Sequence, residues 1–121
     1  MGDLNQSGTK YYNPNYVYNM SSTDMVLGAK NAPKGLSTMG GATRADAMEA
    51  GKAWVGPGAK PITNGNGEII GYSSQDALRA FRLQYKPKEG RVRANFTENT
   101  LNERTNGKKE VKNVHVDIME E

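Results

Sequence analysis

The sequence predicts an α+β protein in which a short N-terminal helix packs on a four- or five-stranded antiparallel sheet. Three observations predict this class. A capped helical segment begins near residue 43, an Asn-Gly-Asn-Gly run marks a tight turn at residues 64–67, and two later segments alternate apolar and polar residues. At 121 residues the chain has the usual size of one domain.

Residues 1–42 show no sustained period of a helix or a strand and are rich in Asn, Gly, Ser, Thr and Tyr. This composition predicts a polar linker or a loosely packed N-terminal arm, which its tyrosines could hold against the domain. We therefore expect the domain itself to occupy residues 43–121.

The expected helix follows Thr43, which resembles the first residue of a capping box because an acidic residue stands three positions later. Ala45, Met48 and Lys52 fall on one face of such a helix, since they are three or four residues apart. Gly51 is the expected end of the helix.

The run at residues 64–67 predicts a β-hairpin, because Asn-Gly readily adopts the positive φ angles of tight turns. The segment after the hairpin has two interpretations. Ser73 and Asp76 could cap a helix, or residues 78–85 could form a strand with Arg79 at one edge. The strand would bury Phe81, Leu83 and Tyr85.

Residues 91–96 and 111–118 are the clearest strands, because apolar and polar side chains alternate along both. Residues 98–112 between them are expected to form a long polar loop with a turn at Asn106-Gly107. The apolar faces carry Val92, Ala94 and Phe96, then Val114, Val116 and Ile118. The polar faces carry Arg91, Arg93 and Asn95, then Asn113, His115 and Asp117.

The charge of the chain is segregated, which indicates a polyanionic partner. Residues 52–93 carry eight Lys and Arg side chains against three Asp and Glu, whereas the whole chain has a net charge of +3. A solvated cationic surface is the alternative. The chain has no cysteine, which excludes disulfides and thiolate metal sites. We expect no membrane-spanning segment and no signal peptide.

The polar faces of the two clearest strands carry the groups that can cleave RNA without a metal, provided that both strands share a sheet. The imidazole of His115 can accept a proton from a ribose 2′-OH or donate one to the leaving 5′ oxygen. Arg or Lys side chains can stabilise the charge of the transition state. Asp117 could orient the ring. The alternative is an exposed histidine without a catalytic role, beside arginines that only bind phosphate or keep the surface soluble.

Weaker candidates stand elsewhere in the chain. Lys60 could reach a phosphate from a glycine-rich loop that lacks the pattern of a P-loop. Trp54 could stack on a base, although a Trp just after a short helix usually belongs to the core. One histidine without cysteine excludes a structural zinc site, whereas Glu98, Asp117 and Glu120 leave a magnesium site open without matching a known motif. We expect no cofactor.

Several short motifs follow one another in a fixed order between residues 51 and 118. They are Trp-Val-Gly-x-Gly at 54, Ser-x-Asp at 74 with spaced arginines after it, Lys-Pro at 86, Ala-Asn-Phe at 94 and His-x-Asp-Ile at 115. In this order they resemble the C-terminal toxin modules of filamentous-haemagglutinin-like and Rhs-type bacterial proteins, above all toxins of contact-dependent growth inhibition. Many relatives have Gly-Tyr and Asp-Gly where this chain has Gly-Ala-Lys at 58–60 and Asp-Ala at 76–77.

The resemblance implies an antibacterial toxin that is secreted as part of a larger effector and delivered to the cytoplasm of a target cell. It also implies a cognate immunity protein as partner and a fold related to barnase, colicin ribonucleases and RelE. Several such toxins cleave tRNA, some with elongation factor Tu as a helper. The recurrent positions of the family match Trp54, Lys60, Ser74, Asp76, Arg79, Arg82, Lys86, Asn95 and His115.

We therefore predict a metal-independent ribonuclease that acts on tRNA. The expected catalytic residues are His115 as general acid or base, Arg79 and Lys86 at the scissile phosphate, and Asn95. The expected substrate-binding residues are Lys60, Ser74, Arg82, Arg91, Arg93 and Trp54. The alternatives are a non-enzymatic, basic nucleic-acid-binding module, a metal-dependent DNase toxin, and an interaction domain that binds an acidic protein.

Overall fold

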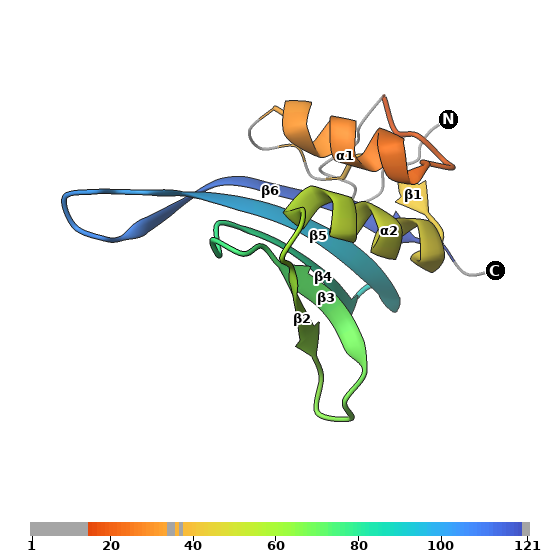
Figure 1. The fold of residues 1–121 in the computed structure, drawn as a ribbon. Helices are drawn as coiled ribbons and strands as arrows, with labels where there is room; N and C mark the ends of the chain where they lie inside the picture. The colour runs from red at the N-terminus through yellow and green to blue at the C-terminus, as the bar shows by residue number, and fades with distance from the viewer. Residues whose placement is uncertain (1–14, 34–35, 37, 120–121) are drawn as a thin grey trace.

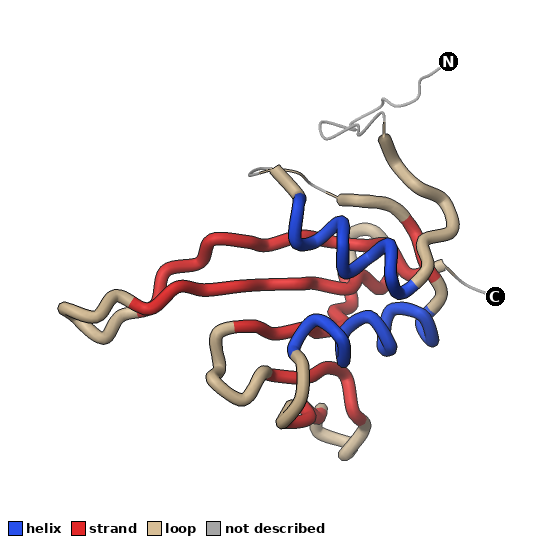
Figure 2. Tube along the Cα trace, turned by 45° about the horizontal axis from the view of Figure 1, so that its top comes forward, coloured by secondary structure: helices blue, strands red, loops and turns tan. Residues whose placement is uncertain are grey.

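A computed structural model describes residues 15–33, 36 and 38–119. It confirms the α+β class, with two helices and a six-stranded mixed sheet instead of one helix and four or five antiparallel strands. Both helices cover the same face of the sheet (Figures 1 and 2). The elements are α1 (Ser22–Asn31), β1 (Gly41–Ala42), α2 (Arg44–Val55), β2 (Lys60–Thr63), β3 (Ile69–Ser73), β4 (Arg79–Lys86), β5 (Arg91–Leu101) and β6 (Lys108–Ile118).

The strands lie in the order β1-β6-β5-β4-β3-β2. All neighbours are antiparallel except β1, which pairs in parallel with β6. The strands β5 and β6 extend beyond the rest of the sheet as a hairpin arm, seen at the left of Figure 1. The expected loop at 98–112 was therefore wrong, because only residues 102–107 connect the two strands. The polar arm has no buried face, so its sequence lacks the alternation that reveals a strand.

The first segment of the fold differs from the expected arm. Ser21 caps α1 through a reciprocal capping box with Asp24. Buried side chains of this region belong to the same hydrophobic core as the sheet, namely Met20, Met25, Ala29 and Met39. Residues 15–42 are thus part of the domain where the structure describes them, while Tyr11 and Tyr12 lie outside the described residues.

The expected cap of α2 is confirmed, since the Thr43 hydroxyl accepts a hydrogen bond from the Asp46 amide at 3.1 Å. The helix nevertheless continues past Gly51 to Val55 and ends at Gly56, whose φ is 80°. A Cβ on Gly51 would lie 2.3 Å from the Phe81 ring, so this glycine lets the helix approach β4. The buried side chains are those of Ala47, Ala50, Trp54 and Val55, and of the three residues placed on one face only Met48 packs partly buried against the core.

The predicted hairpin is confirmed as β2 and β3, with the Asn64 amide donating to the Glu68 carbonyl at 3.0 Å. The strand interpretation of residues 78–85 is also confirmed, because β4 buries Phe81 and Leu83. Tyr85 was expected in the core but is 64% exposed, since it lies near the end of β4, where the strand turns into the next connection.

The core lies between the helices and one face of the sheet. Trp54 packs edge-on against Phe96 at 6.0 Å, and Phe96 contacts Phe81 at 5.1 Å between ring centroids. Val114, Val116 and Ile118 are buried as the alternation of β6 predicted. Because side chains alternate along a strand, the intervening residues must point to the opposite face.

Candidate nucleic-acid interface

The sheet face opposite the helices, called the open face below, is polar across β4, β5 and β6. Register places Arg82 opposite Asn95 and Asn95 opposite His115, so these three side chains form one row across three neighbouring strands. Directly opposite residues have Cβ atoms about 5 Å apart. The open face consists of Ala80, Arg82, Gln84, Lys86, Arg91, Arg93, Asn95, Thr97, Asn113, His115 and Asp117.

A second row lies beside the first and contains an ion-pair network. The Asp117 carboxylate lies 3.3 Å from Arg91 and 3.6 Å from Arg93, and Arg93 is also 3.8 Å from Glu89. Asp117 accepts a hydrogen bond of 2.8 Å from the Tyr16 hydroxyl. The Asp117 carboxylate thus holds two arginines at the end of the open face nearest β1. Burial of Tyr16, together with its hydrogen bond to Asp117, raises the pKa of the Tyr16 hydroxyl.

Asn95 occupies the centre of the first row. Its Nδ2 donates to Asn113 Oδ1 at 3.2 Å. Its Oδ1 is buried and has no hydrogen-bond partner among the described residues. A buried acceptor without a partner is energetically costly, and this one lies between Arg82 and His115 in the row.

The other predicted phosphate-binding residues of this face lie at different distances from His115. Lys86 pairs with Arg91 at the end of β4, on the same face. Lys60 pairs with Ser73 and also faces this side, but β2 is four strands away from β6. At about 4.8 Å per strand this separation is roughly 19 Å. The structure thus brings Arg82, Asn95 and His115 together and leaves Lys60 at the far edge.

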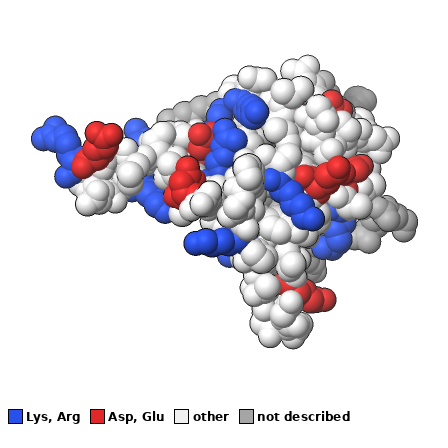
Figure 3. All heavy atoms as spheres, viewed as in Figure 1, with Lys and Arg blue, Asp and Glu red and all other residues white. Residues whose placement is uncertain are grey.

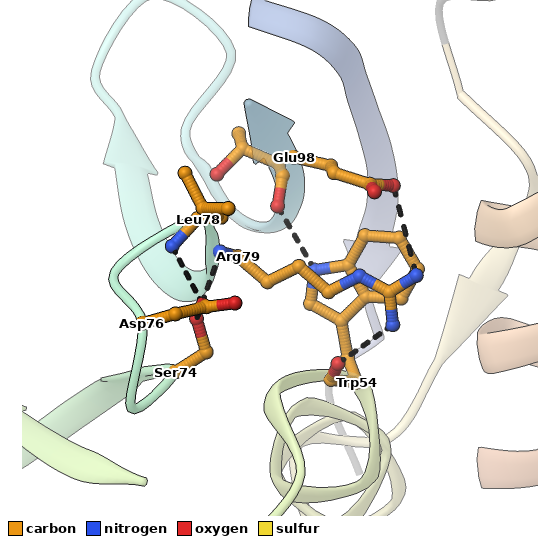
Figure 4. A network of polar contacts seen from close by, with 7 residues as sticks. Trp54, Ser74, Asp76, Leu78, Arg79 and Glu98 are labelled. Carbon is orange, nitrogen blue, oxygen red and sulfur yellow. Dashed lines mark hydrogen bonds and ion pairs between the residues drawn. The ribbon is translucent and has the colours of Figure 1, made fainter. Parts of the chain in front are cut away.

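The opposite side of the sheet holds a separate cavity of about 510 Å³, called the helix-side cleft, where the end of α2 meets the β3–β4 turn. Figure 4 shows the polar network that lines it. The Arg79 guanidinium stacks on the Trp54 ring at 4.1 Å, donates to the Trp54 carbonyl oxygen at 3.1 Å and lies 3.7 Å from Glu98. Arg79 thereby satisfies a carbonyl at the C-terminal end of the helix.

Ser74 and Asp76 organise the turn beside Arg79. The Ser74 hydroxyl donates to the Asp76 carboxylate at 2.7 Å and accepts from the Arg79 amide at 2.9 Å. Asp76 also accepts from the Leu78 amide at 3.0 Å. These hydrogen bonds, first of all the one from Ser74, lower the pKa of Asp76 below its ordinary value.

Three of the predicted site residues therefore lie on the wrong side of the sheet to meet His115. Arg79, Ser74 and Trp54 line the helix-side cleft, because β4 points Arg79 to the same face as Phe81. Trp54 is only 1% exposed, and its Nε1 donates to the Thr97 carbonyl at 3.1 Å. Its ring is a core element that Arg79 covers.

The residues considered for magnesium do not come together. Glu98 lines the helix-side cleft, Asp117 lies on the open face, and Glu120 lies outside the described residues. Within the described ranges no group of three or more His, Asp or Glu side chains forms a metal-ligand set. In Figure 3, Lys and Arg lie beside Asp and Glu in several places on a surface that is otherwise mostly uncharged.

The fold and the open face define this chain as an α+β protein with one helix-covered and one polar sheet face. A scan against protein-family models, a search of curated proteins and a search of solved structures each found no match to this chain. None of the helices in the described part of the chain is long and apolar enough to cross a membrane.

The sequence suggested that tyrosines such as Tyr16 hold the N-terminal segment on the domain, but it did not reveal the contact of Tyr16 with Asp117 or the ion pair of Glu89 with Arg93. The only signal for Glu89 was its position four residues before Arg93. Tyr16 stands 101 residues from Asp117, and no local pattern connects the two.

Proposed function

We propose that this protein binds RNA on the open face and cleaves it without a metal, with His115 as general acid or base. The observation that supports this proposal is the row of Arg82, Asn95 and His115 across three neighbouring strands. It joins a permanent cation, an amide and the only imidazole of the chain on one exposed sheet face.

A phosphate held above Asn95 would have Arg82 on one side and His115 on the other, because the row spans about 10 Å. In the cleavage step the ribose 2′ oxygen attacks the adjacent phosphorus and the 5′ oxygen leaves. His115 accepts the 2′-OH proton or donates a proton to the 5′ oxygen. Arg82 stabilises the extra negative charge on the phosphoryl oxygens in the transition state.

This assignment moves the role expected of Arg79 to Arg82, since of these two arginines only Arg82 shares a face with His115. Lys86, Arg91 and Arg93 would hold neighbouring phosphates, which adds affinity without sequence preference. One imidazole cannot be base and acid in the same step, so a second group is needed. Asp117 and Thr97, each two residues from a member of the row, are the candidates on this face.

The order of motifs at residues 51–118 supports a narrower proposal. In it the protein is an antibacterial toxin that cleaves tRNA in a target cell, with a cognate immunity protein and, in some such systems, elongation factor Tu as partners. This narrower proposal depends on the resemblance, whereas the RNA-cleaving face depends on the sheet register.

The test is cleavage of total RNA by the purified protein in EDTA, with and without elongation factor Tu, compared with His115→Ala. We expect the variant to cleave about 10²- to 10⁴-fold more slowly, the range of general acid–base catalysis. His115→Gln keeps a polar side chain and should be equally slow, and thermal melting shows that both variants fold. Wild-type rates in both variants would refute the role of His115, and metal-dependent cutting of DNA alone would refute the proposed class.

A non-enzymatic nucleic-acid-binding module is the second candidate, and the presence of a single imidazole in the chain favours it. Such a protein would bind RNA with an affinity that falls steeply with added salt, because phosphate contacts release counterions. Binding of this kind without any cleavage product, with or without elongation factor Tu, would select this candidate.

A further inference from the structure

Two tyrosines extend the open face beyond the edge of the sheet. Val17 forms a parallel bridge with Gly40, and Gly41 in turn pairs with Asp117 of β6. Tyr16 and Tyr18, on either side of Val17, therefore point to the same side as Asp117. The hydrogen bond from the Tyr16 hydroxyl to Asp117 agrees with this direction.

The backbone that carries these rings is fixed by hydrogen bonds to the sheet. The Val17 amide donates a hydrogen bond to the Met39 carbonyl at 3.2 Å, and the Gly41 amide donates one to the Val17 carbonyl at 2.8 Å. The Tyr16 hydroxyl passes over Gly41, where an added Cβ would lie 3.2 Å from it. The backbone that carries the two rings is thus held by the sheet.

The outer ring of this pair is available for stacking. Tyr18 is 73% exposed, and its ring leans on that of Tyr16 at 4.8 Å with an interplanar angle of 58°. Tyr16 also shares Asp117 with Arg91, whose side chain is 52% exposed. An exposed aromatic face close to an exposed guanidinium, here that of Arg91, is the combination by which proteins bind unpaired nucleotides, the ring under the base and the cation on the phosphate.

We propose that Tyr18, supported by Tyr16, stacks on an unpaired nucleobase of the strand whose phosphates lie on Arg91 and Arg93. This proposal rests on the proposed function, because it assumes that RNA occupies the open face. It adds a subsite at the β1 edge that selects single-stranded over double-stranded RNA, since a paired base has no free face to offer.

The test measures binding of a fluorescent 2′-O-methyl oligouridylate of about 12 nucleotides, which covers a typical site and has no 2′-OH to react. A second probe carries the same backbone without bases. We expect Tyr18→Ala to weaken binding of the oligouridylate about 5- to 100-fold and Tyr18→Phe to leave it unchanged, because stacking needs only the ring. Tyr85→Ala is the matched control, since this exposed tyrosine belongs to the helix-side face of β4.

The abasic probe separates stacking from other effects, because wild type and Tyr18→Ala should bind it equally. Equal binding of the oligouridylate by wild type and Tyr18→Ala would overturn the stacking subsite and leave the RNA-binding face intact. Equal weakening of both probes would also overturn it, because the loss would not depend on a base. Failure of the wild-type protein to bind either probe would refute the proposed function itself.

Discussion

Arg79 and Arg82 stand three residues apart on β4, yet they lie on opposite faces of the sheet and in opposite environments. Arg79 is stacked on Trp54, hydrogen-bonded to the end of α2 and close to Glu98. Arg82 is exposed, and no described residue forms an ion pair with it. An arginine side chain thus connects α2 and β5 on one face of the sheet, whereas on the other face an arginine is exposed to solvent.

The difference teaches how to separate structural from functional cations in this fold. A guanidinium whose donors already meet protein acceptors contributes to stability, because its loss leaves buried groups unpaired. A guanidinium without such partners can bind a phosphate without breaking any hydrogen bond or ion pair of the folded protein. On this criterion Arg79 belongs to a structural network and Arg82 is the candidate phosphate-binding cation, whereas Arg91 and Arg93 of the open face already share Asp117.

The largest expected effect is an opposite response of the two arginines. Arg82→Ala should lower RNA cleavage about 10²-fold, the cost of removing one transition-state donor, and change stability by less than about 0.5 kcal/mol. Arg79→Ala should lower the free energy of unfolding by about 1–3 kcal/mol, through its hydrogen bond to Trp54 and its stacking, and leave the rate per folded molecule unchanged. Urea unfolding and cleavage rates measured on the same samples check both.

This comparison would be broken if Arg79→Ala abolished cleavage while the protein kept its full stability. The active site would then have to include the helix-side cleft, and Arg82→Ala would be expected to retain activity.

A smaller effect is expected from Gly51→Ala, on the helix side alone. The new Cβ would lie 2.3 Å from the Phe81 ring, so we expect a loss of about 1–3 kcal/mol from overpacking. Gly65→Ala is the matched control, because no atom lies within 4 Å of an added Cβ there. Thermal melting compares the two variants, and a stabilised Gly51→Ala protein would show that β4 can move away from α2.

The smallest expected effect concerns pH and the turn at Asp76. The pKa of Asp76 is lowered in the folded protein, so its stabilising contribution is present above the pKa of the unfolded chain, about 4. The contribution is lost as the pH falls through the folded value. Asp76→Asn should therefore melt slightly below wild type at neutral pH and together with it in strong acid. A difference that grows toward acid pH would contradict this sign.

The sequence revealed those parts of the structure that repeat a simple period. Alternation along 91–96 and 111–118 placed Asn95 and His115 on the polar face, because half-buried strands encode their two sides residue by residue. It could not reveal α1, whose buried residues are only Met25 and Ala29 and form no clear helical stripe. The sequence also did not decide on which side of the sheet Arg79 lies, because residues 78–85 could have formed a helix or a strand.

The network around Asp117 was beyond any local pattern. Its partners Tyr16 and Arg91 come from distant parts of the chain, and only the pairing of β6 with both β1 and β5 brings them together. Register within a sheet is set by tertiary packing, so sequence spacing alone does not give it.

The place of β6 between β5 and β1 also has a consequence for the order of folding. The strand β6 supplies Val114, Val116 and Ile118 to the core and is the sheet strand that pairs with β1. The pairing of β1 with β6 can therefore form only after residue 118 has been synthesised. Pairings at such sequence separation fold slowly compared with local ones, so the final closure of this sheet should be a late step.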